Sequence, residues 1–185
     1  IDLIVELIGG ESGLALDIAN KTLKNKKHLV TANKAMLALH GSKLSTLAHK
    51  FNVNLNFEAS VAGGIPIINI IQSSLLSDNI VNLYGILNGT CNYILSQMLE
   101  KKISFDKALK DAQEKGFAEL DPYDDISGTD TAYKLLILSN LVFGTKEKIT
   151  SVYKEGIEGI ESIDLEMAEK LGYSVTLLGI TNIKK

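Results

Sequence analysis

Short apolar runs alternate with longer amphipathic segments in the first third of the chain. The runs at 3–7 (LIVEL) and 28–31 (HLVT) predict two buried strands of a parallel sheet, and the alternating segment 53–58 (VNLNFE) predicts a third. A helix is predicted between the first two strands, at 12–26, and helical segments around 41–42 precede the third. Strands that alternate with helices in this order predict an α/β fold with right-handed crossovers.

The pattern changes after residue 62, where Gly63, Gly64 and Pro66 interrupt it. We therefore predict a first domain at 1–62 and a second, α+β domain at 63–185. The elements predicted in the second domain are a helix opening at Pro66, a strand at 80–88, a helix at 89–101, a helix capped by Ser104 and ending at Gly116, an acidic loop at 117–128, a helix from Thr129 to about Phe143, a strand near 150–157, a helix near 164–171 and a strand at 174–181.

Composition narrows the class of protein. The chain has 185 residues, of which 45% are hydrophobic, enough for one large domain or two small ones with a packed core. Its net charge of -3 argues against nucleic-acid binding. A single cysteine excludes an internal disulfide framework and favours a cytoplasmic protein. The sequence shows no apolar run of the roughly 20 residues that a membrane span needs, and no secretory signal.

Asp130 and Lys134 lie four residues apart in the predicted helix at 129–143, which places both side chains on one face. As a solvated pair they would contribute about 0.3–0.5 kcal/mol. Apolar residues cover much of the same helix, so Lys134 is also a candidate for partial desolvation, which lowers a lysine pKa and suits proton transfer. The spacing alone leaves both interpretations open.

Four carboxylates, Glu119, Asp121, Asp124 and Asp125, crowd the predicted loop at 117–128. They could form a metal site or a solvated turn, although the spacing lacks the order of a calcium-binding loop. Because a lysine follows them, we favour a third interpretation, in which the acids bind the ammonium group of an amino acid. All four acids, Asp125 among them, are therefore candidates for binding that ammonium group.

Other candidate residues follow predicted strands, where open α/β sheets bind their ligands. Gly9 and Gly10 let the backbone approach a cofactor closely, and Lys34 suits a phosphate or a substrate oxyanion, or is an exposed lysine at a helix start. Glu58 and the carbonyls of the segment at 58–66 suit a hard cation, or form a tight turn between domains.

Asn88, Gly89 and Thr90 open a predicted helix and are candidates for binding an anion or substrate. Cys91 is predicted to be a buried small hydrophobe rather than a nucleophile, because no histidine is near it in the sequence. The three histidines show no metal-ligand spacing and are predicted to be structural.

Taken together, five segments resemble homoserine dehydrogenase, and the resemblance covers essentially the whole chain. These segments are, in order, VELIGG, HLVTANKA, EASVAGGIPII, GILNGTCNYIL and GFAELDPYDDISGTDTAYKLLIL. The resemblance implies a partial Rossmann-like sheet followed by a substrate-binding and dimerisation domain. It also implies reduction of L-aspartate 4-semialdehyde to L-homoserine with NAD(P)H, in threonine and methionine biosynthesis, by a homodimer.

The resemblance implies roles for individual residues. Lys134 matches the proton-donor lysine, Asp130 the carboxylate that accompanies it, and Glu119 the substrate-binding glutamate. Gly116 matches a position beside the nicotinamide, and Lys34 the lysine of the cofactor and substrate cleft. A monovalent cation, Na⁺ or K⁺, is implied at a site whose residues match Glu58 and, through backbone carbonyls, Val61, Gly63 and Ile65.

One departure from the family is the missing G-x-G-x-x-G turn, with which the family begins. The family's chain also continues beyond the segment LLGITNIKK, so we expect this chain to be truncated at both ends. Two alternative hypotheses remain: a catalytically silent fragment or dimerisation module of the same enzyme, and another amino-acid dehydrogenase on a related fold. The intact Lys134, Asp130 and Glu119 argue against the first, and the whole segment GFAELDPYDDISGTD argues against the second.

Overall fold

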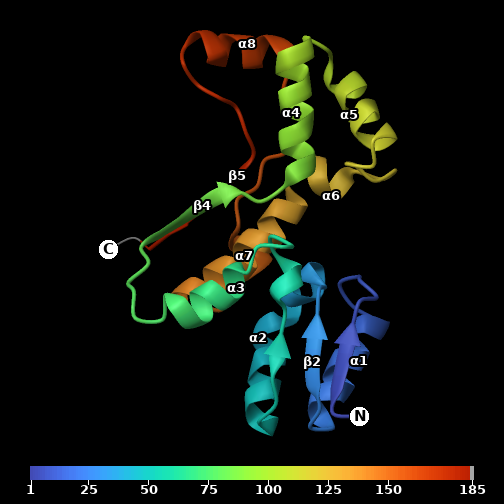
Figure 1. The fold of residues 1–185 in the computed structure, drawn as a ribbon, viewed down its shortest axis with the longest axis vertical. Helices are drawn as coiled ribbons and strands as arrows, with labels where there is room; N and C mark the ends of the chain where they lie inside the picture. The colour runs from blue at the N-terminus through green and yellow to red at the C-terminus, as the bar shows by residue number, and fades with distance from the viewer. Residues whose placement is uncertain (184–185) are drawn as a thin grey trace. The chain divides into compact units, whose positions relative to one another are not determined.

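The computed structural model describes residues 1–183 (Figure 1). Its elements, in chain order, are β1 (Leu3–Glu6), α1 (Leu14–Lys24), β2 (His28–Thr31), α2 (Lys34–Phe51), β3 (Leu55–Asn56), the 3₁₀ turn η1 (Glu58–Ser60), α3 (Ile67–Asn69), the π-helical turn η2 (Ile70–Ser74), β4 (Asn82–Ile86), α4 (Gly89–Lys101), α5 (Phe105–Glu114), α6 (Tyr123–Ile126), α7 (Thr129–Phe143), the 3₁₀ turn η3 (Ile149–Ser151), α8 (Ser162–Lys170) and β5 (Leu178–Asn182).

Contacts divide the chain into two compact units. The sheet unit contains Ile1–Asn82, Tyr133–Val152 and the chain from Asn182, and the helical unit contains Leu83–Ala132 and Tyr153–Thr181. Helix α7 contributes its first turn to the helical unit and the rest to the sheet unit. This division differs from the predicted boundary after residue 62, which stays a prediction.

The sheet unit is built on three parallel strands in the order β1-β2-β3, as predicted (Figure 1). Helices α1 and α2 pack against each other, and α1 buries Ala15, Ala19, Thr22 and Leu23. The shared core consists of Ala15, Ala19, Leu23, Leu29, Met36, Leu44 and Ala48. Leu3 and Val5 of β1 are 45% and 54% exposed, so the prediction that this strand is buried is wrong for one of its faces, and that apolar face is left open by the unit.

Two predictions for the sheet unit need correction. The third strand is only two residues long, and Glu58 lies in η1 rather than in the strand. Its two carboxylate oxygens accept the backbone N–H groups of Ile68 and Asn69, each at 2.9 Å, which draws the chain out of the sheet. The helical segments predicted around 41–42 form one continuous helix, α2.

The helical unit packs α5 and α8 against α4 (Figure 1). Its buried core contains Cys91, Ile94, Leu95, Met98, Ala108, Ala112, Ile126, Ile157 and Leu165. Strands β4 and β5 form a separate two-stranded sheet. Gly116 has a φ of 75°, which ends α5 in the left-handed conformation that glycine allows, as predicted.

The strand predicted near 150–157 is wrong. Only the 3₁₀ turn η3 forms there, and a side chain at Gly156 would lie 2.2 Å from the carbonyl oxygen of Ile126. The backbone at Gly156 is therefore packed against the end of α6, and the next residue, Ile157, donates its N–H to the same carbonyl at 2.8 Å. This hydrogen bond uses the N–H group of Ile157, which would otherwise be available for pairing in a sheet.

Smaller corrections concern the cap of α5, the acidic loop and the ends of the last strand. Ser104 lies at the N-cap position of α5, but its side chain makes no capping hydrogen bond. The acidic loop contains a short helix, α6. β5 begins four residues later than the predicted strand and ends one residue later.

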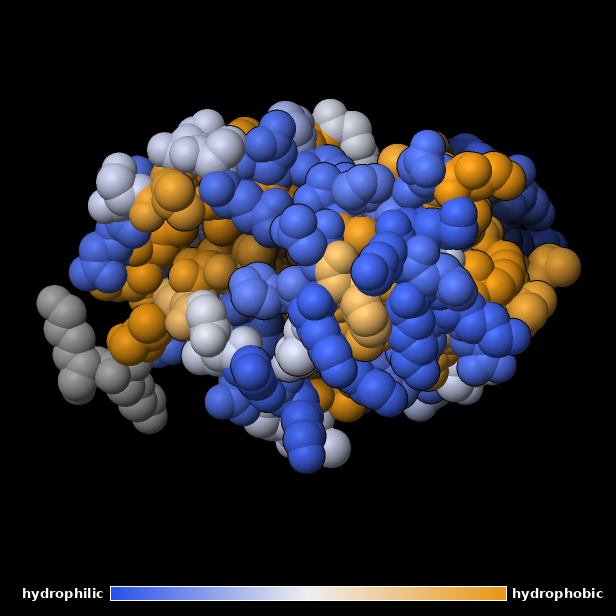
Figure 2. Space-filling model, turned by 90° about the horizontal axis from the view of Figure 1, so that it is seen from below, coloured by the Kyte–Doolittle hydropathy of each residue, from blue (hydrophilic) through white to orange (hydrophobic). Residues whose placement is uncertain are grey.

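Hydrophobic areas lie among hydrophilic ones on the face that Figure 2 displays. In the part of the chain that the structure describes, no helix combines the length and apolar character needed to cross a membrane.

Candidate active site

A buried cluster of polar side chains joins three segments of the helical unit. Asn88, the N-cap residue of α4, accepts the backbone N–H of Cys91 at 2.8 Å through its amide oxygen. Its amide nitrogen donates to Asp125 Oδ1 at 2.6 Å and to Asp130 Oδ2 at 2.9 Å. Asn88 and Asp130 are each only 2% exposed. The structure thus brings together three predicted site residues, with two carboxylates meeting on one amide group.

The negative charge of this cluster acts on Cys91. Burial, followed by the nearby charges of Asp125 and Asp130, raises the pKa of the thiol to about 12. The thiol donates to the backbone carbonyl of Asp125 at 3.1 Å. Cys91 is fully buried and protonated at neutral pH, which agrees with the prediction that it is not a nucleophile.

The remaining predicted residues of this unit lie around the segment 116–120. The Thr90 hydroxyl donates to the carbonyl of Phe117 at 2.7 Å, and the Gln113 side chain donates to the carbonyl of Glu119 at 3.1 Å. The Glu119 side chain and Gly116 are exposed, and so is Gly89, the first residue of α4. The segment therefore presents Glu119 from a backbone held at two points.

The end of α5 next to Gly116 is fixed by a surface cluster. The Tyr93 hydroxyl donates to Asp111 at 2.6 Å, and the Lys115 ammonium lies 2.9 Å from the same carboxylate. The Tyr93 hydroxyl and Lys115 lower the pKa of Asp111, and the hydrogen bonds to Tyr93 and Asp111 raise the pKa of Lys115. Tyr93 also packs its ring on Phe117, at 4.7 Å between centroids.

In the sheet unit, a buried carboxylate shapes the turn that follows β1. Glu6 is 1% exposed and accepts the backbone N–H groups of Ile8 at 2.7 Å and Gly9 at 3.2 Å. Its other oxygen accepts the hydroxyl of Thr31, at the end of β2, at 2.5 Å. Three neutral donors from two adjacent strand ends thus surround one buried charge.

The same turn is tied to the start of α2. Asn33, the N-cap residue of α2, accepts the N–H of Met36 at 3.1 Å and donates its side-chain amide to the carbonyl of Gly10 at 2.8 Å. Lys34 follows directly, as the first residue of α2. The predicted cofactor residues Gly9 and Gly10 therefore belong to one hydrogen-bonded arrangement, and Lys34 directly follows its member Asn33 in the chain.

The conformation of the turn requires glycine. Gly9 and Gly10 have φ angles of 83° and 87°, in the left-handed region. A Cβ added at Gly9 would meet no atom within 4 Å, so the turn faces open space. The exposed side chains of Leu7 and Ile8 flank it. An open, glycine-lined turn at the carboxyl end of a parallel strand fits a nucleotide cofactor.

A hydrogen bond connects helix α7 to this turn. The Tyr133 hydroxyl donates to a carboxylate oxygen of Glu11. Tyr133 is 7% exposed, and the next residue, Lys134, is half-buried. Lys134 and Asp130 lie one helical turn apart on α7.

The predicted cation residues lie in the loop that follows β3. Val61 is buried, whereas Gly63 and Ile65 are exposed. The carbonyl of Ile65 accepts the N–H of Ile67 at 2.8 Å, and Ala62 has a φ of 50°. Within residues 1–183, no group of three or more histidine, cysteine or acidic side chains could hold a metal ion.

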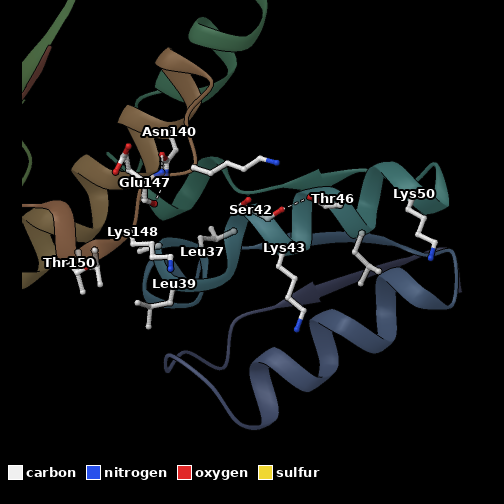
Figure 3. Close-up of a pocket in the computed structure, with 14 residues that line it drawn as sticks. Leu37, Leu39, Ser42, Lys43, Thr46, Lys50, Asn140, Glu147, Lys148 and Thr150 are labelled. Atoms are coloured by element: carbon white, nitrogen blue, oxygen red, sulfur yellow. Dashed lines mark hydrogen bonds between the residues drawn. The ribbon is translucent and has the colours of Figure 1, made fainter. Parts of the chain in front are cut away.

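A hollow of about 700 Å³ in the sheet unit lies outside these clusters (Figure 3). Helix α2 lines one side with Lys43, Thr46 and Lys50, and the segment after α7 lines the other with Lys148 and Thr150. Figure 3 shows the amino groups of the three labelled lysines lying well apart. None of the residues predicted for the candidate site lines this hollow.

Sequence reasoning missed five residues that organise the turn: Glu6, Glu11, Thr31, Asn33 and Tyr133. One signal was available, because Glu6 is a charged residue inside an otherwise apolar predicted strand. Buried charges are almost always paired or hydrogen-bonded. The other four act through contacts between segments distant in sequence, which periodicity does not reveal.

Comparison with known families matches the chain in two parts. Residues 66–184 match the family model described as homoserine dehydrogenase, and residues 1–58 match its NAD-binding domain. Among curated relatives, homoserine dehydrogenase from Helicobacter pylori is 52% identical over 97% of this chain and 42% of its own length. The enzyme from Neisseria gonorrhoeae is 48% identical over 98% of this chain and 41% of its own length. The chain thus spans less than half the length of these relatives.

Solved structures show the same similarity. The crystal structure of a homoserine dehydrogenase from Thiobacillus denitrificans has a TM-score of 0.97 and 45% identity, covering 100% of this chain and 43% of that one. A hyperthermophilic archaeal homoserine dehydrogenase in complex with NADPH has a TM-score of 0.82 and 27% identity, covering 98% of this chain and 52% of that one.

Proposed function

Because this chain belongs to the homoserine dehydrogenase family, we propose that the protein containing it interconverts L-aspartate 4-semialdehyde and L-homoserine with NAD(P)H. The observation that carries the proposal is the buried Asn88–Asp125–Asp130 cluster at the start of α7, with Lys134 one helical turn further on. This part of the fold supplies both an acidic binding group and a proton donor.

The carboxylates suit the ammonium group that both substrates carry. Asp125 and Asp130 share one amide donor, and this places two negative charges next to each other at the buried end of the loop. Glu119 adds an exposed carboxylate on a braced segment. A charge-assisted hydrogen bond to ammonium is stronger than a neutral one, so these acids would orient the amino acid.

Lys134 suits the proton transfer. In the reductive direction, the aldehyde carbon accepts a hydride, and the oxygen takes a proton from the Lys134 ammonium, which gives the alcohol and a neutral amine. In the reverse direction the amine removes the hydroxyl proton as hydride leaves the carbon. A pre-placed cation also stabilises the negative charge that develops on the oxygen.

The nicotinamide cofactor, when bound, supplies or accepts the hydride. The open Gly9–Gly10 turn, Lys34 at the start of α2, and Gly116 are the residues that we propose to hold it. A Cβ at Gly9 would occupy the open space above the turn and would strain the backbone, so the turn fits a group that approaches the main chain closely.

A monovalent cation at Glu58, Val61, Gly63 and Ile65 is part of the proposal, supported by the family resemblance and by oxygen ligands, which hard cations prefer. The Glu58 carboxylate already accepts two backbone N–H groups, so it would contribute its remaining lone pairs. A homodimer in the cytoplasm is likewise supported by the family resemblance.

The test uses the full-length protein, NADPH and two aldehydes. L-Aspartate 4-semialdehyde should be reduced, with loss of NADPH absorbance. Succinate semialdehyde, which has the same carbon chain without the amino group, should react far more slowly. Equal rates would contradict ammonium recognition by the acids, and no reaction with either aldehyde would contradict the proposed reaction and favour a catalytically silent module.

A further inference from the structure

The turn between β1 and α1 is held at three points, and each point belongs to a different element. Glu6 fixes the backbone N–H groups of Ile8 and Gly9 from the end of β1. Asn33 holds the carbonyl of Gly10 from the N-cap of α2. Glu11, the next residue of the turn, accepts the hydroxyl of Tyr133 from α7. All of these residues belong to the sheet unit.

The first two contacts define the shape of the turn, and the third contact has a different consequence. Glu6 and Asn33 come from the strands and helices that surround the turn in the predicted cofactor site. Tyr133 lies on α7 and directly precedes Lys134. Its contact with Glu11 therefore links the Gly9–Gly10 turn directly to the helix that carries the proposed proton donor.

We propose that the Glu11–Tyr133 hydrogen bond is a latch that sets the position of Lys134 relative to the Gly9–Gly10 turn. The latch rests on the proposed function, for which it supplies two positioning residues that act through the turn and through α7. Neither side chain needs to touch the substrate.

The environments of the two side chains suit this role. Tyr133 is 7% exposed, so its ring is fixed by packing, and its hydroxyl group donates to Glu11 in the turn. Glu11 is exposed and lies in a segment with positive φ angles at Gly9, Gly10 and Gly13. Glycines leave such a segment many backbone conformations, so a contact to a buried helix selects one of them.

A small displacement of α7 would be costly for the reaction. Proton and hydride must reach the oxygen and carbon of one carbonyl group together. Misplacement of a reacting group by about 1 Å lowers rates by on the order of a hundred-fold. Loosening the latch should therefore lower kcat by roughly ten- to a hundred-fold, with a smaller change in the KM for homoserine.

Four variants of the full-length protein test the latch. Tyr133→Phe keeps the buried ring and removes only the hydroxyl, and Glu11→Ala removes the acceptor. Glu11→Gln retains a neutral acceptor and should keep most of kcat, which separates the hydrogen bond from the charge. The double variant Glu11→Ala/Tyr133→Phe should be no worse than either single variant, because all three remove one interaction.

Tyr153→Phe is the matched control. The Tyr153 hydroxyl also donates to a glutamate, Glu155, at 2.9 Å, but Tyr153 is 84% exposed in the helical unit. Loss of this hydrogen bond should leave kcat and both KM values unchanged.

Amide hydrogen exchange tests the latch without any substrate. In Tyr133→Phe and Glu11→Ala, exchange at residues 8–13 should increase several-fold, while exchange in α4 stays unchanged. This readout remains valid if the protein catalyses a different reaction, in which case the proposed function fails and the latch stands. Unchanged exchange in the turn, or additive losses of kcat in the double variant, would overturn the latch.

Discussion

Both units of the chain bury a carboxylate at a predicted site, but they surround it differently. Glu6, in the sheet unit, receives two backbone N–H groups and one hydroxyl, all neutral donors from the strand ends. Asp130, in the helical unit, shares the amide of Asn88 with a second carboxylate, Asp125. The hydrogen bonds that Glu6 accepts therefore come from neutral donors, whereas Asp130 shares its amide donor with a second carboxylate.

The difference suggests different tasks. A carboxylate surrounded by backbone donors stabilises one backbone conformation, because leaving those donors unpaired in the interior costs free energy. Two neighbouring carboxylates repel each other, and a bound cation such as an ammonium group relieves that repulsion. We therefore expect Glu6 to determine the shape of its turn, and the acids of the helical unit to determine ligand affinity.

The largest effect should come from Lys134, the charge that we propose acts in the reaction itself. Lys134→Ala in the full-length protein should lower kcat by roughly 10²–10⁴-fold, the usual contribution of a general acid, and should change cofactor affinity little. Steady-state kinetics in both directions measure kcat, and calorimetry measures cofactor binding. Lys148→Ala, in the exposed segment after α7, is the control. A Lys134→Ala variant that keeps most of its kcat would remove this residue from the mechanism.

The same isosteric substitution at Glu119 and at Glu6 sharpens the comparison. Glu119→Gln removes an exposed negative charge and should raise the KM for aspartate semialdehyde and homoserine by roughly ten- to a hundred-fold, as expected for a charged hydrogen bond. The midpoint of urea unfolding should not change. If instead KM stays constant and the midpoint falls, Glu119 is structural and the proposed ammonium site is wrong.

Glu6→Gln should have the opposite effect: it should lower stability and leave KM nearly unchanged. It converts one of two acceptor oxygens into an N–H donor, so either the N–H groups of Ile8 and Gly9 or the hydroxyl proton of Thr31 loses its acceptor. Unfolding free energy should fall by about 1–3 kcal/mol, the cost of a buried unpaired group. The effect on the KM for homoserine should be minor. Urea denaturation and steady-state kinetics on the same samples measure the unfolding free energy and the KM. A large rise in KM without a loss of stability would place Glu6 among the ligand-binding acids.

The sequence was informative where local chemistry decides the structure. HLVT forms β2, GTCNYILSQMLEK forms α4, and Gly116 ends α5, because apolar runs and glycine backbones act within a few residues. The segment 150–157 was mispredicted because its backbone is packed against Ile126, which no local pattern records.

The same contrast between local chemistry and long-range packing holds for the candidate site. Asn88, Asp125 and Asp130 were each singled out from sequence, but the single amide that joins them is visible only in the fold. The Glu11–Tyr133 contact spans 122 residues and left no signal in either segment. Side-chain types and strand ends therefore predict which residues belong to a site, while long-range packing determines which of them meet.

The smallest effect should come from Cys91, the neutral member of the acidic cluster. Cys91→Ala loses a sulfur atom from a small buried site, so unfolding free energy should fall by about 1 kcal/mol at pH 7, and KM for homoserine should not change.

The pH dependence of this stability difference is more informative. Burial and the nearby aspartates raise the thiol pKa from 9.0 to about 12. Above pH 9 the unfolded chain releases the thiol proton and the folded chain retains it, so this contribution to stability is complete below pH 9 and is lost as pH rises toward 12. Because each pH unit in that range costs wild type about 1.4 kcal/mol, its stability advantage over Cys91→Ala should shrink above pH 9 and then reverse, as measured by urea unfolding at several pH values. A difference that stays constant up to pH 11 would show that the aspartates and burial do not hold the proton on Cys91, and would weaken the view of this cluster as a concentrated negative charge.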